Sequence, residues 1–278
     1  MVPPIWNWLR EHLPARVKTW WWFATDPSWR REYLTVHRPI RERQRARRSA
    51  IRAISSQTGN VIASGPFAGM KYVASWGDTH FTNRLLGTYE KEVAGIVEGI
   101  CQRGYQLVVD VGAADGYYAC GLMWRMPAAR MKAFEMQVRL HPLLREIAAK
   151  NGLEERLELF GVCTVETLRR ELDTSGRCLV VCDVDGVEID LLDPALVPQL
   201  IKADLLVEVH DRIRPNVSKA LTERFQPTHS VEFVVQVPRG LHDLPTSIRL
   251  DANLAVKVMN EGRGPDNDWL WMRSKAAL

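Results

Sequence analysis

Apolar and polar positions follow two different patterns along residues 85–278. Short continuous apolar runs recur, and between them lie segments whose apolar residues are three or four positions apart. Continuous apolar runs are typical of strands buried on both faces, and the wider spacing is typical of helices that cover such strands. The pattern predicts an α/β fold, a mostly parallel sheet with helices on both faces.

The apolar runs and the segments between them place the individual elements. The strands are predicted at Leu107–Val111, Met131–Phe134, Leu157–Val162, Cys178–Cys182, Leu205–Val209 and Val231–Val237. The helices between them are predicted at Tyr117–Met126, Val138–Lys150, Val165–Leu172, Leu191–Leu200 and Val217–Phe225. One more helix is expected to begin at Thr88 and to end at Gly104, since glycine commonly follows a helix end.

The chain before residue 85 has a different character. Residues 1–55 are predicted to form a helical arm, with six of the ten tryptophans in residues 1–29 and seven arginines between Arg38 and Arg52. Residues 56–84 are predicted to form a β-hairpin cap, because apolar and small residues surround the glycines at positions 65 and 69.

Residues 238–267 are predicted to be an irregular insertion in the domain that spans residues 85–278. Unstructured stretches of this length are usually functional or disordered, so this one is expected to help wall a substrate pocket. Its cationic side chains are either substrate contacts or solvated loop charges: Arg239, His242, Arg249 and Arg263.

Composition narrows the class of protein. The chain has 278 residues, 46% hydrophobic and 25% charged, which is typical of a globular protein. No apolar run approaches the roughly 18 residues of a membrane span. The first residues lack the pattern of a signal peptide, so a cytoplasmic location is expected. The five cysteines lack CxxC spacing and are expected to be reduced thiols.

The net charge of +4 is unevenly distributed. Residues 1–55 carry a net +8, and the rest of the chain carries −4. A basic arm beside an acidic domain does not require a nucleic-acid partner, and none is expected. The arm either packs on its own domain or on a second subunit, as in a homodimer, or it contacts a membrane surface or another partner.

The segment LVVDVGAADGYYA, residues 107–119, carries the strongest chemical signal. An apolar strand containing Asp110 leads into a tight loop with Gly112 and Gly116, and a helix begins at Tyr117. In a doubly wound sheet this loop lies at the carboxyl edge, where ligands bind. Glycines let a ligand approach the backbone, and the helix N-terminus offers free N–H donors to an anion.

A second carboxylate, Glu135, ends the next predicted strand 25 residues after Asp110. A carboxylate in this place can accept hydrogen bonds from both hydroxyls of a ribose. The loop at residues 112–116 lacks the GxGxxG spacing that seats a pyrophosphate, which disfavours a nicotinamide dinucleotide. The alternative is a purely structural strand-turn-helix with a solvated Glu135.

Three segments resemble the FkbM-like branch of class I S-adenosylmethionine-dependent methyltransferases. VVDVGAADGYYA is similar to that branch's motif I, and LLGTYEKEV, residues 85–93, is similar to the segment before it. CDVDGVEIDLL, residues 182–192, resembles the motif after the fourth strand, with Asp185 where the branch usually has glutamate. The resemblance covers roughly residues 60–275 and leaves out the tryptophan-rich arm.

The resemblance implies a Rossmann-like, seven-stranded sheet whose last strand is antiparallel, here Trp269–Arg273. It also implies S-adenosylmethionine as cofactor. Glu135 would hold the ribose, Gly161 and Val162 would flank the adenine, and Asp183 would lie beside the transferable methyl group. The other cofactor-binding residues expected on this basis are Glu90, Asp110, Gly112, Ala113, Asp115, Gly116 and Met136.

The segment LLVEVHD, residues 205–211, adds candidates for catalysis. Glu208 and His210 lie two positions apart on one predicted strand and therefore point to the same side. With Asp183 at the neighbouring strand end they form a predicted reaction centre in which His210 is the general base. The alternative is a hydrogen-bonded histidine without a catalytic role. No metal is expected, although a divalent ion on Asp183, Asp185 and His210 or Asp211 is the other arrangement that these residues permit.

These features together predict an S-adenosylmethionine-dependent methyltransferase that methylates a hydroxyl oxygen of a small molecule or a saccharide. The alternative function is a noncatalytic Rossmann-like binding or scaffold protein that is recruited through its N-terminal arm. The choice of an oxygen acceptor rests on the family resemblance and not on the chemistry of the site.

Overall fold

The structure, a computed structural model, describes residues 26–32, 34–35, 38–73, 80–172, 175–263 and 267–276. The chain divides into two compact units, residues 1–52 and residues 53–278. In the first unit, helix α3 spans Pro27–Glu32 and helix α4 begins at Arg38; α4 ends at Thr58, in the second unit. The first 25 residues of the predicted arm lie outside the described residues. No helix in the described ranges is long and apolar enough to cross a bilayer.

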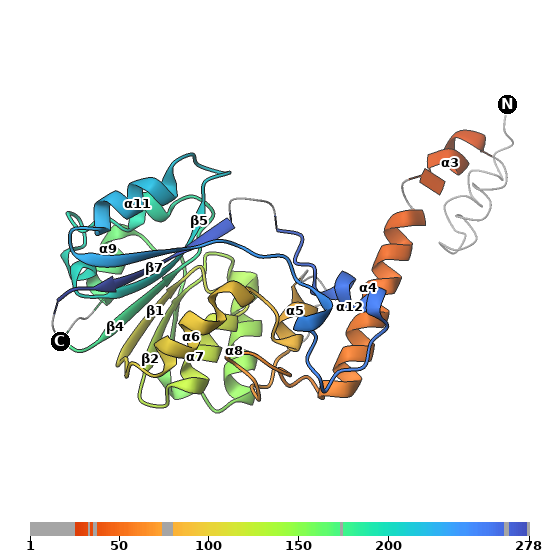
Figure 1. The fold of residues 1–278 in the computed structure, drawn as a ribbon, viewed down its shortest axis with the longest axis horizontal. Coiled ribbons are helices and arrows are strands. Elements are labelled where there is room, and N and C mark those ends of the chain that lie inside the picture. The colour runs from red at the N-terminus through yellow and green to blue at the C-terminus, as the bar shows by residue number, and fades with distance from the viewer. Residues whose placement is uncertain are drawn as a thin grey trace, which may run out of the picture. The chain divides into compact units, whose positions relative to one another are not determined.

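The second unit contains a seven-stranded sheet with the order β3-β2-β1-β4-β5-β7-β6 (Figure 1). The strands are β1 (Leu107–Val111), β2 (Arg130–Phe134), β3 (Leu157–Phe160), β4 (Cys178–Cys182), β5 (Asp204–His210), β6 (His229–Val234) and β7 (Asn267–Ser274). Strand β7 runs antiparallel to both of its neighbours, β5 and β6, and the other described strand pairs are parallel. This arrangement confirms the predicted fold, the Rossmann-like sheet of class I methyltransferases with an antiparallel last strand.

Helices cover both faces of the sheet (Figure 1). One face carries α6 (Ala94–Cys101), α7 (Tyr117–Arg125) and α8 (His141–Lys150), and the other carries α9 (Val165–Glu171) and α11 (Val217–Phe225). The remaining α-helices of the unit are α5 (Phe81–Leu86), α10 (Glu188–Leu191) and α12 (Ala252–Met259). Short 3₁₀ turns lie at Lys91–Val93, Val138–Leu140, Glu154–Arg156, Pro198–Ile201 and Leu241–Asp243.

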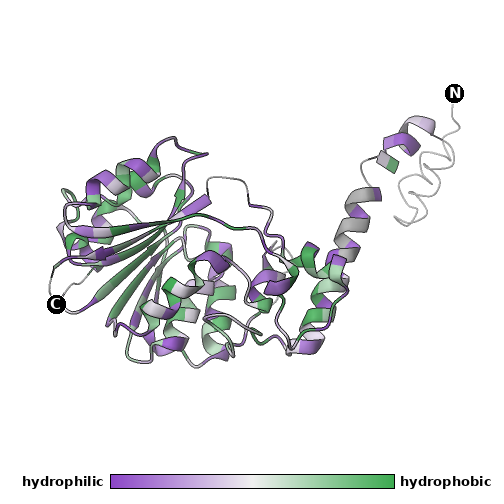
Figure 2. Ribbon diagram, viewed as in Figure 1, coloured by the Kyte–Doolittle hydropathy of each residue, from purple (hydrophilic) through white to green (hydrophobic). Residues whose placement is uncertain are grey.

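The interior explains why the central strands are recognisable in the sequence. Every residue of β1, β4 and β5 is buried. Such strands need apolar side chains on both faces, and Figure 2 shows hydrophobic residues concentrated along them. All five cysteines are free thiols, as predicted.

Two predictions about the chain before the sheet are wrong. The hairpin predicted within residues 59–73 is reduced to a single antiparallel bridge between Val61 and Lys71. Between these residues the chain turns at Gly65 and Gly69, which have φ angles of +74° and +89°. The helix expected from Thr88 begins only with the 3₁₀ turn at residue 91, because Glu90 adopts the left-handed conformation.

Two predictions about later segments are also wrong. The helix expected over Leu191–Leu200 is split into α10 and a 3₁₀ turn, since prolines at positions 194 and 198 interrupt the backbone hydrogen bonds of a helix. The insertion predicted to be irregular contains α12, which packs against α5. The Asp251 side chain caps α12 by accepting hydrogen bonds from the amides of Asn253 and Leu254.

One close contact yields a test of this packing. Phe67 lies on α7 so tightly that a Cβ atom on Gly121 would be 2.4 Å from its ring. Overpacking costs about 1–3 kcal/mol, whereas alanine favours a helix interior over glycine by roughly 1 kcal/mol. We therefore expect Gly121→Ala to lower the free energy of unfolding, measured by urea denaturation.

Gly99 in α6 is the matched control, because no atom lies within 4 Å of the position of its added Cβ. Gly99→Ala should raise the free energy of unfolding by up to about 1 kcal/mol. Equal effects of the two substitutions would contradict the packing of Phe67 on α7.

Candidate functional site

The candidate site lies at the carboxyl edge of the sheet, where β1, β2, β4 and β5 end. Asp110, the fourth residue of β1, is buried. The amide of Ala119 donates a hydrogen bond to its carboxylate, but its Oδ2 has no hydrogen-bond partner among the described residues. Burial, and secondarily the charge of Glu135, raises the pKa of Asp110 to about 7. A buried oxygen without a donor is suited to receive a hydrogen bond from a ligand.

The loop after β1 requires glycine at two positions. Gly112 has a φ of +88°, and a Cβ atom there would lie 1.8 Å from the carbonyl oxygen of Asp183. Gly116, with a φ of +93°, is the N-cap of α7. The amides of Gly112 and Ala113 both donate to the carbonyl oxygen of Phe134 at 2.9 Å, so the loop is held against the end of β2.

Glu135 follows β2, and its carboxylate connects the loop after β1 to the loop after β2. Its carboxylate accepts hydrogen bonds from the amide of Ala114 at 2.9 Å and from the amide of Gln137 at 2.5 Å. Each carboxylate oxygen can accept more than one hydrogen bond, so Glu135 can still bind hydroxyl groups.

Two apolar side chains on this edge are exposed. Met136 after β2 is 71% exposed, and Val162 after β3 is 62% exposed. Gly161, also exposed, has no atom within 4 Å of the position that a Cβ atom would take. The ends of β2 and β3 therefore present open apolar surface next to the carboxylate of Glu135.

Asp115 does not face this open edge. Its buried carboxylate accepts hydrogen bonds from the Tyr72 hydroxyl at 2.5 Å and from Nη1 of Arg84 at 2.6 Å. The Arg84 guanidinium also lies 4.5 Å from the centre of the Tyr89 ring. The Oδ2 atom of Asp115 thus joins the loop to the segment before it, while its Oδ1 is buried without a hydrogen-bond partner among the described residues. The predicted role of Asp115 in cofactor binding stays a prediction.

Glu90 lies in the interior near the reaction centre. Its carboxylate accepts a hydrogen bond from the Tyr118 hydroxyl at 2.5 Å. Burial raises the pKa of Glu90 to about 8, and the charge of Glu208 adds to this effect while Arg263 opposes it. The expectation that Glu90 binds the cofactor stays a prediction.

His210, the last residue of β5, is surrounded by carboxylates. Its Nδ1 is 2.6 Å from Oε1 of the fully buried Glu188. Its Nε2 is 3.5 Å from Asp183, 3.7 Å from Asp185 and 4.0 Å from Glu208, measured to the nearest carboxylate oxygens. The structure therefore brings together the predicted catalytic residues Asp183, Glu208 and His210. Glu188 is not among the residues predicted from the sequence for this centre.

The surroundings of His210 change its titration. Burial alone lowers the pKa of this imidazole, but the hydrogen bond to Glu188 and the charges of Glu208 and Asp185 outweigh burial, so its pKa lies above the ordinary value. Burial, with the charge of Glu208, raises the pKa of Asp183 well above the ordinary value. His210 and Asp183 therefore both keep a proton to higher pH than an ordinary histidine or aspartate does.

The same centre has the spacing of a cation site. One ligand atom from each of Asp183, Glu208 and His210 lies within 4.8 Å of the others, so a divalent ion could be held there. A protonated imidazole satisfies the same carboxylates without an ion. Asp211 lies apart from this group, since its carboxylate accepts a hydrogen bond from the amide of Ser218 in α11.

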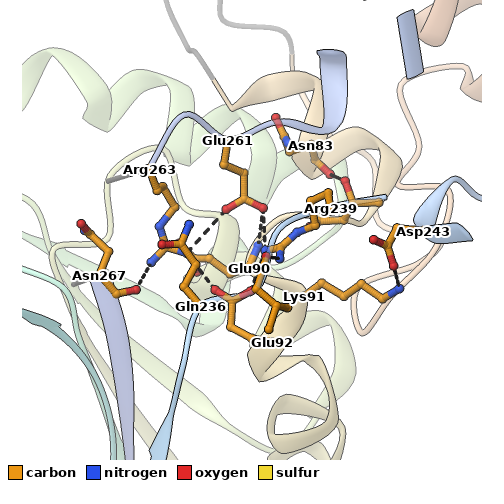
Figure 3. A network of polar contacts seen from close by, with 12 residues as sticks. Asn83, Glu90, Lys91, Glu92, Gln236, Arg239, Asp243, Glu261, Arg263 and Asn267 are labelled. Carbon is orange, nitrogen blue, oxygen red and sulfur yellow. Dashed lines mark hydrogen bonds and ion pairs between the residues drawn. The ribbon is translucent and has the colours of Figure 1, made fainter. Parts of the chain in front are cut away.

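A buried network of charges lies beside the centre (Figure 3). Arg263 contacts Glu208, and its Nη1 is 2.9 Å from Glu92. Arg239 contacts Glu92 at 2.6 Å and Glu261 at 2.7 Å. Side chains from β5, from the 3₁₀ turn before α6 and from the insertion are joined in this way. The prediction that these two arginines are solvated loop charges is wrong, because both side chains are buried in ion pairs. The alternative, that they contact a substrate, stays a prediction.

The two other cationic residues of the insertion lie outside this network. The side chain of His242 is 81% exposed and lies beside Asp243. The backbone amide of Arg249 donates a hydrogen bond to Gln57, and its guanidinium donates one to the carbonyl of Thr246. The structure describes no contact between either residue and the carboxylates that surround His210.

No protein-family model and no curated protein matches the chain. Solved structures match at low identity. The O-methyltransferase TomG from Streptomyces achromogenes, in complex with SAM, is 14% identical with a TM-score of 0.44, covering 73% of this chain and 82% of that one. The cofactor-bound protein Rv0187 from MTB is 17% identical with a TM-score of 0.41, covering 82% and 88%. A precorrin-6y C5,15-methyltransferase from Geobacter metallireducens is 12% identical with a TM-score of 0.43, covering 66% and 88%.

The buried network gives a stability test. Arg263→Gln leaves Glu208 buried without its arginine and removes one of the two arginines that pair with Glu92. Breaking a buried pair in this way costs about 3–5 kcal/mol. We expect a loss of this size in the free energy of unfolding, measured by urea denaturation at neutral pH.

Arg130→Gln is the matched control. Arg130 pairs with Glu158 at 2.8 Å on the exposed surface, where an ion pair contributes about 0–1 kcal/mol. Similar losses of unfolding free energy in the two variants would show that Arg263 does not stabilise its buried acidic neighbours.

Proposed function

We propose that this protein transfers a methyl group from S-adenosylmethionine to a hydroxyl oxygen of a small molecule or a saccharide. One observation carries the proposal: the sheet edge that holds Glu135 and the exposed apolar side chains after β2 and β3 also holds a histidine among carboxylates. The first group suits an adenosine, and the second suits removal of a proton from an acceptor.

The residues of the first group fit the parts of the cofactor. Glu135 accepts hydrogen bonds from the ribose hydroxyls, and the exposed side chains of Met136 and Val162 pack on the adenine. Gly112 lets the loop after β1 lie directly against the carbonyl of Asp183, which keeps the two parts of the site together. The N-terminus of α7, after Gly116, offers amide donors for the carboxylate of the methionine part.

The residues of the second group fit the chemistry of an oxygen acceptor. The cofactor supplies an electrophilic methyl group, and the bond from this carbon to the acceptor oxygen forms as its bond to sulfur breaks. The acceptor hydroxyl must lose its proton, which His210 takes on Nε2. Glu188 accepts a hydrogen bond from Nδ1 and thereby leaves Nε2 free of its own proton. The carboxylate of Glu208, 4.0 Å from Nε2, stabilises the imidazolium that results.

The surface around this centre indicates where an acceptor enters. Val187 and Ile213 are 53% and 58% exposed, and Ile213 packs against Gly186. Asp185, in the left-handed conformation, is exposed between them and the histidine. An acceptor that passes this mouth meets apolar side chains and one carboxylate, which suits a molecule with both apolar and hydroxyl-bearing parts.

Cofactor binding is the first test. Glu135→Ala removes the ribose acceptor and should weaken binding of S-adenosylmethionine and S-adenosylhomocysteine by about 1–3 kcal/mol, measured by isothermal titration calorimetry. Glu155→Ala, an exposed acid after α8, should change neither affinity. Tight binding of NADH without binding of either sulfur ligand would overturn the proposal.

Catalysis by His210 is the second test. His210→Ala should lower turnover by about 10²–10⁴-fold and leave cofactor affinity nearly unchanged, measured as transfer of labelled methyl to an acceptor found in a screen of sugars and phenols. In the unmodified enzyme, the rate should rise with pH through a pKa above the usual value of histidine, because the neutral imidazole is the base.

A chelator separates the base from a metal ion at the same place. EDTA should leave turnover unchanged, because in this proposal His210 removes the acceptor's proton without a metal ion. Loss of turnover in EDTA with recovery in Mg²⁺ or Mn²⁺ would assign Asp183, Glu208 and His210 to an ion instead. Cofactor binding without transfer to any acceptor would favour the noncatalytic alternative.

A further inference from the structure

The first unit of the chain carries a strip of positive charge on helix α4. Five arginines follow one another at spacings of three, four, three and four residues: Arg38, Arg41, Arg45, Arg48 and Arg52. At 3.6 residues per turn these positions fall within an arc of about 80° around the helix. All five residues are exposed. We call this row the arginine strip.

The strip is continuous along one side of α4, and the helix has two further arginines, Arg43 and Arg47, at positions on its other side. From Arg38 to Arg52 it extends about 21 Å along the helix axis at 1.5 Å per residue. Glu42 is the one acidic residue in this stretch of sequence, and its position falls outside the spacing of the strip. A row of exposed arginines of this kind attracts a polyanionic partner.

We propose that the arginine strip binds the surface of a bilayer that contains anionic phospholipids. A flat surface can contact all residues of one narrow strip at once. Arginine is suited to lipid phosphates because its planar guanidinium donates paired hydrogen bonds to phosphate oxygens.

The adjacent sequence favours a lipid over a nucleic acid as the partner. Six of the ten tryptophans lie in residues 1–29, immediately before the strip. Tryptophan is enriched at membrane–water interfaces, where its ring lies at the level of the headgroups. The rest of the chain carries a net charge of −4, so it does not extend the basic surface that a long nucleic acid would follow. The inference is independent of methyl transfer.

The test is sedimentation of the full chain with vesicles. The protein should bind vesicles of phosphatidylcholine with about 30% phosphatidylserine and should not bind phosphatidylcholine alone. Each arginine near an anionic surface contributes about a fivefold increase in the partition coefficient. Replacing Arg41, Arg45 and Arg48 with glutamine should therefore lower the partition coefficient about a hundredfold.

A variant with the same change in charge provides the control. Arg145, Arg169 and Arg273 are exposed residues of the second unit, and their replacement with glutamine should leave binding nearly unchanged. The affinity for S-adenosylmethionine should be the same in both triple variants. This comparison keeps a failure of membrane binding separate from a failure of the proposed function.

Three results would overturn the inference. One is equal binding to neutral and anionic vesicles, and another is equal loss in the two triple variants. The third is binding to a single-stranded oligonucleotide that exceeds vesicle binding and depends on the same three arginines, because the partner would then be a nucleic acid.

Discussion

The close approach of two backbones at the carboxyl edge is the constraint on which the candidate site depends. The added Cβ atom of any other residue at Gly112 would overlap the carbonyl oxygen of Asp183, and the amide of Asp183 donates to the carbonyl of Val111 at 2.9 Å. The loop after β1 is thereby held both to the end of β2 and to the end of β4. Since Glu135 follows β2 and Asp183 follows β4, this contact determines how far the proposed cofactor site lies from the proposed base.

The sequence predicts the elements best where burial is most complete. Strands β1 and β4 begin and end at the predicted residues, because a strand covered on both faces shows as an uninterrupted apolar run. Strand β6 is shifted by two to three residues, since it lies at the edge of the sheet and most of its residues are only partly covered. The hairpin could not be predicted correctly, because its small residues serve turns and close packing and not a ladder of paired strands.

The candidate site is predictable only in the parts that local sequence determines. Asp110, Glu135 and His210 each end or adjoin an apolar run, so their place on the edge follows from the order of strands and helices. The partner of His210, Glu188, lies 22 residues earlier, and no spacing links the two. The pairing of Arg263 with Glu208 likewise depends on how the insertion folds back, and any of several acids could have taken that place.

The position of β7 has a consequence for how the chain folds. This strand follows every other strand in the sequence, yet it lies between β5 and β6 and pairs with both. Strand β6 therefore has no neighbour in the sheet until β7 has been synthesised and inserted. During that interval the exposed edge of β5 can pair with other chains, as unpaired edges do in folding intermediates. Aggregation during synthesis is thus a greater hazard for this chain than for a sheet whose strands are added in sequence order.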